Sequence, residues 1–409
     1  MNALDLAETY RDLHANPELS YQETRTAALV AGHLRAFGYE VSENVGRTGV
    51  VGILRNGPGP TMLLRADMDA LPVEEKTGLP YASTVRAVDH FGHDVPVMHA
   101  CGHDVHVTCL LGAAETLAAD RSTWRGTLQC VFQPAEELGT GSRAMLDDDF
   151  YERFGTPSVV LGQHVAPLPA GMLGLRAGSA FAAADSLRVV MHGRGGHGSR
   201  PDATIDPIVM AAATVMRLQT VVSREVPGGD TAVLTIGALN AGTKENIIPD
   251  DAVMLLNIRT FDEDVRAKVM AAIERIVHSE AAASGAPKPP DIETMMSFPV
   301  LVNTASAVEV IARGFAEEFG AGNVMDPGPV TGSEDVGLFA TEAGVPCVYW
   351  LLGGADPAAF AGATDLEEAK KIAYGLPSNH SPLFAPVVEP TLRVGVAALV
   401  RGVGVWAGR

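Results

Sequence analysis

The sequence predicts an α/β protein with a mostly parallel, mixed sheet and an inserted α+β segment. Short apolar runs alternate with helical patterns over residues 1–180, the pattern changes near residue 181, and it resumes near residue 297. Strands that alternate with helices form a largely parallel sheet with helices on both faces. We therefore expect one discontinuous domain of residues 1–180 and 297–409, and a separate domain of residues 181–296.

The elements of the first part follow from the spacing of its apolar residues. Apolar positions three and four apart predict helices over about residues 2–15 and 21–37. The runs "GVVGILRNG" and "TMLLRADM" are predicted strands on either side of a turn at Asn56–Pro60. A helix from Asp104 and strands at "GTLQCVFQP" and "SVVLGQHV" complete this part.

Residues 181–296 follow a different order. A strand at "ADSLRVVMHG" precedes a helix, two strands at "TAVLTIGAL" and "AVMLLNIRTF", a second helix and a last strand at "DIETMMSFP". This β-α-β-β-α-β order is that of a ferredoxin-like unit. The helix "VEVIARGFAEEFG", the strand "VPCVYWLLG" and the helix "LRVGVAALVRGVGVWAG" then resume the α/β pattern.

Length and charge exclude several classes of protein. A chain of 409 residues is too long for one ordinary core, so two domains are expected. The net charge of -19 opposes binding to nucleic acid or to an anionic membrane. No apolar run reaches the roughly 18 residues of a membrane span. The chain opens on an acidic helical pattern instead of a signal peptide, and its four cysteines form no paired framework. These features predict a cytoplasmic protein.

Reactive side chains follow several predicted strands. Asp67 and Asp69 follow one strand, Glu136 and Glu137 follow another, and His164 follows a third. Because ligands bind beyond the carboxyl ends of parallel strands, we expect these side chains to converge on one crevice.

The motif "MHACGHDVH" adds donor atoms at the start of a helix, and "SNHSPLF" adds one in a polar loop. Thiolate, imidazole and carboxylate together suit a borderline transition metal. The spacing matches neither a zinc finger nor H-E-x-x-H. Five ligands suggest two ions, roughly 3.5–4 Å apart in hydrolytic sites. The candidates are Cys101, His103, Glu137, His164 and His380.

The neighbouring Glu136 and Glu137 indicate a division of roles. If one carboxylate binds metal, the other can take the proton of water whose pKa the metal lowers to about 7, and can later deliver it to a leaving amine. Alternatively, both acids only begin a helix, where the helix dipole favours carboxylates. The residues alone leave both interpretations open.

Taken in order, eight motifs resemble one known family, across essentially the whole chain. They are "LLRADMDALPVEE", "MHACGHDVHVTCLLGAA", "QPAEELGTGSRAML", "GQHVAP", "GGHGSRPDATIDPI", "NIIPD", "GSEDVG" and "NHSPLF". The family is the M20 metallopeptidases, and the closer resemblance is to its amidohydrolase branch: hippurate hydrolases, N-acyl-amino-acid hydrolases and auxin-conjugate hydrolases. The resemblance implies hydrolysis of N-acyl-L-amino acids to a carboxylic acid and a free amino acid. It also implies that the inserted ferredoxin-like domain is a lid that forms a homodimer, or a tetramer.

The resemblance also implies roles for individual residues. Glu136 would be the general base and acid, and the lid residue His197 would reach the partner's active site and stabilise the oxyanion. Asn246 and Arg259 would hold the substrate carboxylate. Each subunit would hold two divalent ions, Zn²⁺ or Mn²⁺, with Co²⁺ or Ni²⁺ also allowed. Their ligands would be Cys101, His103, Glu137, His164 and His380.

One departure concerns the metal ligands. Classical members carry His-x-Asp where this chain has Asp67-Met68-Asp69, so Cys101 belongs to the branch's own ligand set. We expect Asp67, Asp69 and Asp104 to orient the ligands. Direct ligation by Asp67 or Asp69 stays open.

Other functions remain as alternatives. A dipeptidase or carboxypeptidase would use the same fold, and a binding protein without catalysis would use it too. A thiol enzyme would use Cys101 as a nucleophile paired with His103. The run "GRGGHG" matches a dinucleotide fingerprint, but Pro201 follows at once and no acidic ribose partner appears.

The remaining histidines and cysteines have plainer interpretations. We expect supporting roles for His99 and His106, and solvent exposure for His90 and His93. The others lie in helices or strands without an expected cluster, or are expected to be buried thiols: His14, His33, His192, His278, Cys109, Cys130 and Cys347.

Overall fold

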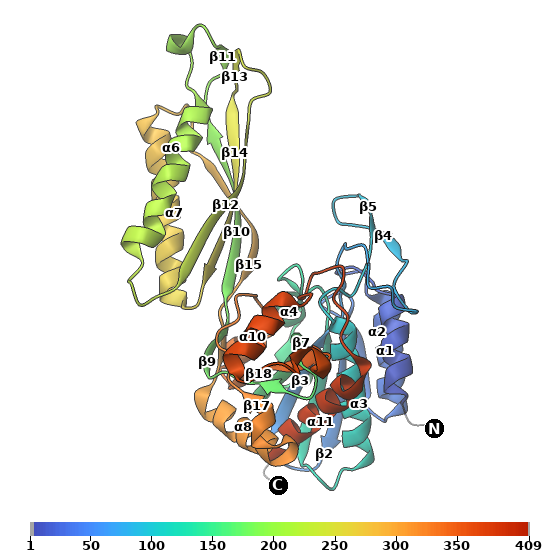
Figure 1. Ribbon diagram of the computed structural model, residues 1–409. Helices are drawn as coiled ribbons and strands as arrows, with labels where there is room; N and C mark the ends of the chain where they lie inside the picture. The colour runs from blue at the N-terminus through green and yellow to red at the C-terminus, as the bar shows by residue number, and fades with distance from the viewer. Residues whose placement is uncertain (1–3, 408–409) are drawn as a thin grey trace. The chain divides into compact units, whose positions relative to one another are not determined.

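The computed structural model describes residues 4–407, which fall into two compact units (Figure 1). Of the described residues, the first comprises 4–180, Val302–Gly328 and 335–407, and the second comprises Phe181–Leu301 and Pro329–Glu334. Residues 329–334, where the chain returns briefly from the first unit, belong to the second unit. Val330 forms a β-bridge with Phe181, and its carbonyl accepts a hydrogen bond from the N–H of Ala182.

The first unit is built on a mixed sheet whose centre is parallel. Strands β6, β3, β7 and β18 run parallel, whereas β1, β2 and β8 join antiparallel. In sheet order the strands are β1 (Glu40–Val45), β2 (Gly49–Asn56), β6 (Gly126–Gln133), β3 (Thr61–Asp67), β7 (Val159–Pro169), β18 (Cys347–Ala355), β8 (Leu173–Gly174) and β17 (Val324–Met325). The predicted fold class is confirmed.

Helices cover both faces of this sheet. The helices of the unit are α1 (Leu6–Ala15), α2 (Thr24–Ala36), α3 (His103–Ala119), α4 (Gly141–Leu146), α5 (Phe150–Phe154), α8 (Ala305–Phe319), α9 (Gly337–Ala343), α10 (Leu366–Gly375) and α11 (Val388–Trp406). Alternate residues of β6 contact helices on opposite faces of the sheet. Leu128 and Phe132 join the core that contains α3, whereas the Gln129 amide donates to the carbonyl of Phe154 on α5, at 2.8 Å.

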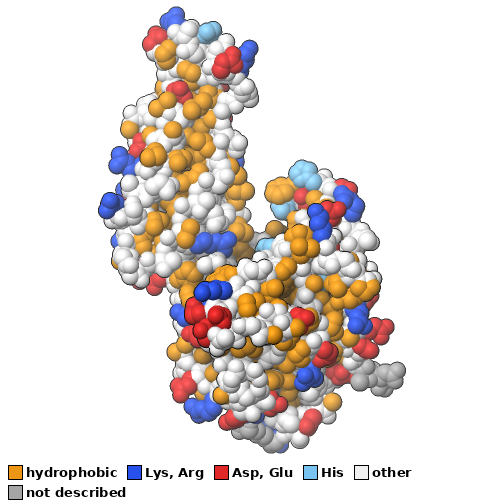
Figure 2. Space-filling view, viewed as in Figure 1, with side chains coloured by type: hydrophobic (Ala, Val, Ile, Leu, Met, Phe, Trp, Pro, Cys, Tyr) orange, Lys and Arg blue, Asp and Glu red, His pale blue; other side chains and the backbone are white. Residues whose placement is uncertain are grey.

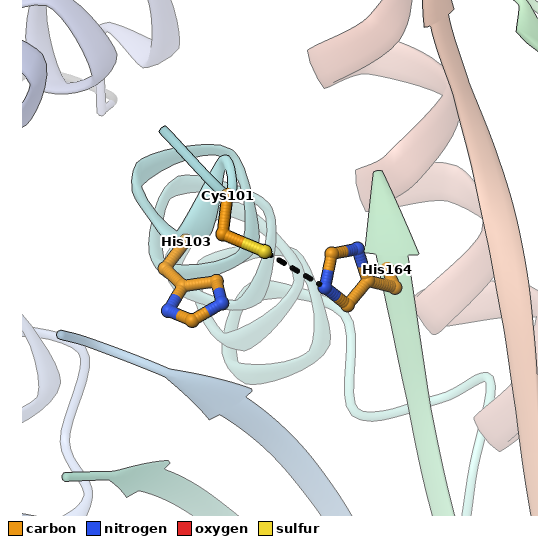
Figure 3. Close-up of side chains that lie close together, drawn as sticks. All are labelled: Cys101, His103 and His164. Carbon is orange, nitrogen blue, oxygen red and sulfur yellow. Dashed lines mark hydrogen bonds between the residues drawn. The ribbon is translucent and has the colours of Figure 1, made fainter. Parts of the chain in front are cut away.

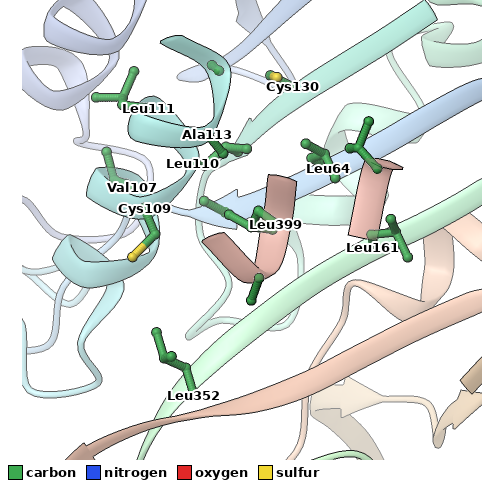
Figure 4. Packing of buried hydrophobic residues seen from close by; sticks show 14 of the residues in the cluster. Leu64, Val107, Cys109, Leu110, Leu111, Ala113, Cys130, Leu161, Leu352 and Leu399 are labelled. Carbon is green, nitrogen blue, oxygen red and sulfur yellow. The ribbon is translucent and has the colours of Figure 1, made fainter. Parts of the chain in front are cut away.

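The main core lies between the sheet and the helices α3 and α11 (Figure 4). Leu64 and Leu161 come from neighbouring strands, and Leu110 and Leu399 come from the two helices. The cysteines expected to be buried thiols are buried, and none of them forms a disulfide within residues 4–407. Burial of this apolar surface holds the strand ends that carry the polar side chains.

The sequence missed the edge strand β1 and the short helices α4, α5 and α9. Strand β1 has a mostly exposed, polar sequence without alternation, and the three helices have at most seven residues, too few to show helical periodicity. A hairpin of β4 (Arg86–Val88) and β5 (Asp94–Pro96) was also missed.

The second unit is the ferredoxin-like element. Its sheet has the order β12-β14-β10-β15, and all three pairings are antiparallel. In chain order its elements are β10 (Ala183–His192), α6 (Pro207–Thr220), β12 (Ala232–Ala241), β14 (Asp251–Thr260), α7 (Glu263–Ala283) and β15 (Asp291–Phe298). The carboxylates of Asp206 and Asp262 cap the two helices.

Short strands complete the structure: β9 (Gly178–Phe181), β11 (Gly196–His197), β13 (Ile247–Ile248) and β16 (Leu301–Asn303). Over the part of the chain that the structure describes, no helix combines the length and the apolar character that crossing a membrane requires.

Candidate active site

The motif around Cys101 forms the turn into helix α3. Gly102 adopts a left-handed conformation with φ of 84°, and a Cβ added there would lie 2.3 Å from Cγ1 of Val165. Glycine is therefore required both by the backbone and by the space. The turn brings the donor atoms of Cys101 and His103 into one cluster.

Cys101, His103 and His164 form the first group of candidate metal ligands (Figure 3). Their donor atoms lie within 4.8 Å of one another. The Sγ atom of Cys101 points at the ring of His164, 3.5 Å from its Nε2 atom. His103 comes from the start of α3 and His164 from β7, so the group joins a helix start to a central strand.

Backbone carbonyls fix the tautomers of these two histidines. His103 donates from Nδ1 to the carbonyl of Asp69 at 2.8 Å, and His164 donates from Nδ1 to the carbonyl of Val165 at 2.9 Å. When neutral, each ring therefore keeps the lone pair of Nε2 for the cluster, which is the tautomer that a metal ligand needs.

Cys101, Glu137 and His380 form the second group, so the thiol belongs to both groups. The Nε2 atom of His380 lies 3.4 Å from Oε1 of Glu137. The same carboxylate oxygen lies 3.9 Å from Nε2 of His103, which links the two groups.

The loop that carries His380 is tied to the motif by the backbone. The N–H of His380 donates to the carbonyl of Ala100 at 2.8 Å. The side-chain amide of Asn379 donates to the carbonyls of Cys101 and Val165, at 3.0 and 3.1 Å. The sequence analysis missed Asn379, and no local pattern in "SNHSPLF" separates it from an ordinary loop residue.

Glu136 lies beside both groups. Its Oε2 atom is 3.9 Å from Nε2 of His103, and Glu136, Glu137 and His103 form a further group of close donor atoms. Glu136 is 4% exposed, so its carboxylate is largely shielded from water.

The electrostatics of the cluster favour a bound cation. Burial and the charge of Glu137 raise the pKa of the Cys101 thiol well above its usual value. Burial lowers the pKa of His103, but the charges of Asp67 and Asp69 outweigh it and raise the pKa to about 10. A divalent cation would reverse both effects, because it stabilises the thiolate and replaces the proton of the imidazole.

Two buried atoms of the cluster also lack a hydrogen-bond partner among residues 4–407: Nε2 of His103 and Oε1 of Glu137. Buried polar atoms without a partner are costly and ask for an explanation. Sulfur, imidazole nitrogen and carboxylate oxygen together form a donor set that suits zinc-like ions. The residues present therefore fit a metal centre.

Asp67 contacts both His103 and His106. Its Oδ2 atom lies 3.7 Å from Nε2 of His103, and the donor atoms of the three residues lie within 4.8 Å of one another. His106 donates from Nδ1 to Oδ1 of Asp67 at 2.5 Å and accepts at Nε2 from the N–H of Val165 at 2.8 Å. Both nitrogens of His106 are thus in use. The other oxygen of Asp67 pairs with Arg65. Burial opposes ionisation of Asp67, but the charges of Arg65 and His103 hold its pKa well below the usual range.

Asp69 contacts both His103 and the segment that carries the two glutamates. Its Oδ2 atom accepts from the N–H of Glu137 at 3.0 Å and from the hydroxyl of Ser20 at 2.6 Å. Its backbone carbonyl holds His103, as described above. The residue therefore orients one candidate ligand and anchors the backbone of another.

We expected Asp104 to orient the ligands, but its side chain contacts His14. Its carboxylate accepts from Nδ1 of His14 at 2.7 Å, and Nε2 of His14 lies 3.1 Å from Oε1 of Glu75. We expected no cluster around His14, so this expectation was wrong: 90 residues separate it from Asp104. Burial lowers the pKa of His14, but its bonds to the two carboxylates raise it to about 10.

The other histidines near the motif differ in exposure. His99 is 2% exposed, and burial lowers its pKa to about 4, so its ring is neutral. His90 and His93 are exposed, as expected, and Figure 2 shows histidine side chains at the surface over the hairpin of β4 and β5.

The second unit places His197 beside Asn246. His197 pairs with Ile247 between β11 and β13, and the N–H of Gly198 donates to the carbonyl of Asn246 at 2.9 Å. The Nδ1 atom of His197 accepts from the N–H of Ser199 at 3.1 Å. A neutral His197 therefore carries its proton on Nε2, as a hydrogen-bond donor.

Arg259 lies far from that pair. It sits near the end of β14 and donates to the hydroxyl of Ser333 at 2.8 Å. Asp251, at the start of β14, is eight residues away, or roughly 26 Å at 3.3 Å per residue. The residues that precede Asp251 lead further from Arg259. They lie beside the segment that carries His197, because the N–H of Gly193 donates to the carbonyl of Asp250.

Comparison with known proteins identifies the family. Residues 63–374 match peptidase family M20/M25/M40. The chain belongs to this family. It is therefore a metal-dependent hydrolase that acts on amide bonds, and the predicted family is confirmed.

Curated relatives and solved structures match most of the chain. A thermostable carboxypeptidase of Saccharolobus solfataricus is 37% identical over 95% of this chain and 92% of its own length. The hippurate hydrolase of Campylobacter jejuni is 41% identical over 83% of this chain and 85% of its own length. Among solved structures, the YXEP protein of Bacillus subtilis, described as a dinuclear metal binding peptidase from the M20 family, is 29% identical. It has a TM-score of 0.75 and covers 98% of this chain and 96% of that one.

Proposed function

We propose that this chain is an N-acyl-L-amino-acid amidohydrolase that releases a carboxylic acid and a free amino acid. One observation carries the proposal: donor atoms of five residues and the buried carboxylate of Glu136 meet in a single cluster of the first unit. Hydrolysis of an amide needs a polarised carbonyl, an activated water and a proton for the leaving amine.

A feature that two relatives share supports the proposed substrate class. Hippurate is benzoylglycine, and a carboxypeptidase removes a residue that carries a free α-carboxylate. In both cases the amide nitrogen that leaves belongs to an amino acid with a free carboxylate. Arg259 is half-buried and its pKa is lowered by burial, so a substrate carboxylate would restore the solvation that its guanidinium lacks.

Two divalent ions would occupy the cluster, with Cys101 contributing to both ligand groups. When bound, the ions supply Lewis acidity, which polarises the substrate carbonyl and makes water acidic enough to be activated near neutral pH. The donor set suits Zn²⁺ or Mn²⁺, and Co²⁺ or Ni²⁺ would also fit.

Glu136 would carry the proton. Its carboxylate, next to the ligand Glu137, takes a proton from the attacking water and delivers it to the amine as the amide bond breaks. Its low exposure keeps bulk water from competing for that proton. Asp67 and Asp69 would hold His103 and Glu137 in place through the contacts described above.

His197 would donate from Nε2 to the oxyanion of the tetrahedral intermediate. Arg259 lies near one end of β14 and His197 lies in β11, beyond the other end, and an N-acyl amino acid is much shorter than β14. If both residues contact one substrate, they come from different chains. We therefore propose a homodimer in which His197 acts on the partner's site.

Exposed apolar side chains on the second unit support this assembly. Val209 and Met216 of α6 are 65% and 72% exposed, and Val233 and Leu239 project from the edge strand β12. The absence of disulfides among the described cysteines and the net charge of -19 fit a protein of the reducing cytoplasm that acts on small molecules.

A substrate panel tests the proposal. The chelated enzyme, with and without added Zn²⁺ or Mn²⁺, is assayed on N-acetyl, N-benzoyl, long-chain acyl and indole-acetyl amino acids, and on dipeptides and longer peptides with a free amino terminus. We expect metal-dependent release of amino acid from at least one acyl class. Turnover of peptides alone would favour the carboxypeptidase alternative, and a metallated enzyme with no turnover would favour a binding protein.

The thiol alternative is tested in the same assay. Activity that survives chelation but is lost to iodoacetamide would make Cys101 the nucleophile. The proposal expects the opposite, namely loss on chelation and protection of the thiol from alkylation by the added metal.

A further inference from the structure

Glu23 is a buried acid without an evident structural purpose. It occupies the residue before α2 and is 0% exposed, yet its side chain makes no capping hydrogen bond to that helix. The carboxylate of Glu18 accepts instead from the N–H groups of Arg25 and Thr26 in the first turn of α2. The usual reason for an acid at a helix start therefore does not apply to Glu23.

The carboxylate of Glu23 faces the segment that carries the proton carrier. Its Oε1 atom accepts from the N–H of Ala135 at 2.8 Å, and its Oε2 atom accepts from the hydroxyl of Thr48. Ala135 immediately precedes Glu136 and lies 112 residues from Glu23. A residue from the N-terminal helices thus holds the backbone next to the proposed general base.

Ala135 needs such a hold because its backbone is strained. Its φ is 49°, in the left-handed region that residues with a Cβ disfavour. This reversal turns the chain out of β6 and aims Glu136 at the cluster, where its Oε2 lies 3.9 Å from His103 Nε2. Strained residues persist only where surrounding contacts fix them, and they occur often at functional sites.

A second carboxylate holds the other side of Glu136. The N–H of Glu137 donates to Oδ2 of Asp69, which also accepts from the hydroxyl of Ser20. The backbone N–H groups of the residues before and after Glu136 are therefore both bound by buried carboxylates. Ser20 and Glu23 come from the same short segment before α2, so this one segment supports the backbone on both sides of Glu136.

Burying a carboxylate opposes stability unless it makes compensating bonds. Burial, with the charge of Asp69 nearby, raises the pKa of Glu23 to about 7. Either protonation state can accept from Ala135 at Oε1, so the contact does not depend on the charge.

We propose that Glu23 is a positioning residue that holds Ala135 in its left-handed conformation and thereby aims Glu136 at the reacting atoms. The inference rests on the proposed function, because it assigns the proton transfer to Glu136. Loss of the acceptor leaves the ligands in place but lets Glu136 move. A misplacement of about 1 Å can lower the rate about 100-fold.

The test compares Glu23→Ala with Glu23→Gln in the metallated enzyme. In Glu23→Ala, we expect kcat to fall about 10- to 100-fold, with KM and metal content changed less than about two-fold. In Glu23→Gln, the amide oxygen can still accept from Ala135, so kcat should stay within about three-fold of the wild type.

Glu18→Ala is the matched control. It removes the cap of α2 in the same segment without touching Ala135, so it should lower the melting temperature while kcat stays at the wild-type level. Equal losses of kcat in Glu18→Ala and Glu23→Ala would overturn the inference, since they would reflect general loosening of the segment.

Two further variants distinguish a failure of the positioning role of Glu23 from a failure of the proposed function. Glu23→Asp keeps the charge but shortens the reach, so it tests the contact if Glu23→Ala does not fold; full kcat in Glu23→Asp would overturn the inference. Glu136→Gln tests the proposed function itself. If Glu136→Gln is inactive while Glu23→Ala keeps full kcat, the positioning role alone fails. If Glu136→Gln remains active, the proposed proton transfer fails.

Discussion

At the scale of the residue, His14 is held as a cation between two buried carboxylates. His14, Asp104 and Glu75 have side chains exposed by 1%, 1% and 0%. The unfolded histidine has a pKa of about 6.5, whereas the folded value is about 10. The stabilisation is therefore complete below pH 6.5 and is lost as the pH rises through 10.

His14→Gln should destabilise the fold most at low and neutral pH. Removing one partner of a buried ion pair costs about 3 kcal/mol, because Asp104 stays buried without its cation. The difference in unfolding free energy from the wild type should shrink as the pH approaches 10, which denaturant unfolding at several pH values measures. His33→Gln, on the partly exposed face of α2, is the control. A difference that does not change with pH would show that folding leaves the pKa of His14 unchanged, which would contradict the ion pair.

The residue types in the sequence predicted the candidate metal ligands better than the buried residues that hold the site in place. Cysteine, histidine and glutamate are recognisable donors, so Cys101, His103 and Glu137 could be proposed from the sequence. His14 and Glu23 could not, because their partners lie 90 and 112 residues away and nothing near them in the sequence marks the contact.

At the scale of the element, the start of α3 depends on one glycine. Gly102 has a φ of 84° and no room for a Cβ, whereas Gly92 in the β4–β5 hairpin has a φ of 85° and nothing within 4 Å. The two glycines share the same backbone strain and differ in the space around them. Replacing each of them by alanine therefore distinguishes the effect of backbone strain from the effect of a steric clash.

Gly102→Ala should lose metal and activity, whereas Gly92→Ala should keep both. The strain alone costs about 1 kcal/mol in either variant. At Gly102 the added methyl group also displaces Val165 or the Cys101 turn, and this separates the donor atoms. Metal analysis of the purified variants, with melting temperatures, checks the expectation. Full metal content in a folded Gly102→Ala enzyme would contradict the account of this turn.

The long elements could be predicted because the pattern of their apolar residues along the sequence indicates which side chains are buried. Helix α3 and the strands β3 and β6 carry many apolar residues and are almost wholly buried. Strand β1 escaped prediction because its residues are polar and mostly exposed, so its position depends on pairing with β2. Pairing between strands leaves no local signal in the sequence.

At the scale of the whole molecule, the inserted unit could be predicted from its order of elements alone. The return of 329–334 to that unit could not, because Val330 pairs with Phe181 far away along the chain. The separation of His197 from Arg259 along β14 has a direct consequence for assembly, since the proposal requires two chains for one complete site.

Mixed dimers test this requirement. His197→Ala and Glu136→Gln should each be nearly inactive alone. A heterodimer of the two contains one site with both an intact Glu136 and an intact partner His197, so mixing should restore part of the activity. Absence of any restoration, in a mixture shown to exchange subunits, would mean that His197 acts within its own chain.

The central claim is that a metal pair in this cluster and the carboxylate of Glu136 together hydrolyse the substrate. The most direct measurement is a metal titration of the chelated wild type and of Glu136→Gln, following both bound metal and hydrolysis of the best N-acyl amino acid. We predict two bound ions per chain in both proteins, with kcat in Glu136→Gln reduced at least about 100-fold. Comparable turnover by the fully metallated Glu136→Gln enzyme, or full turnover by the metal-free wild type, would contradict the account.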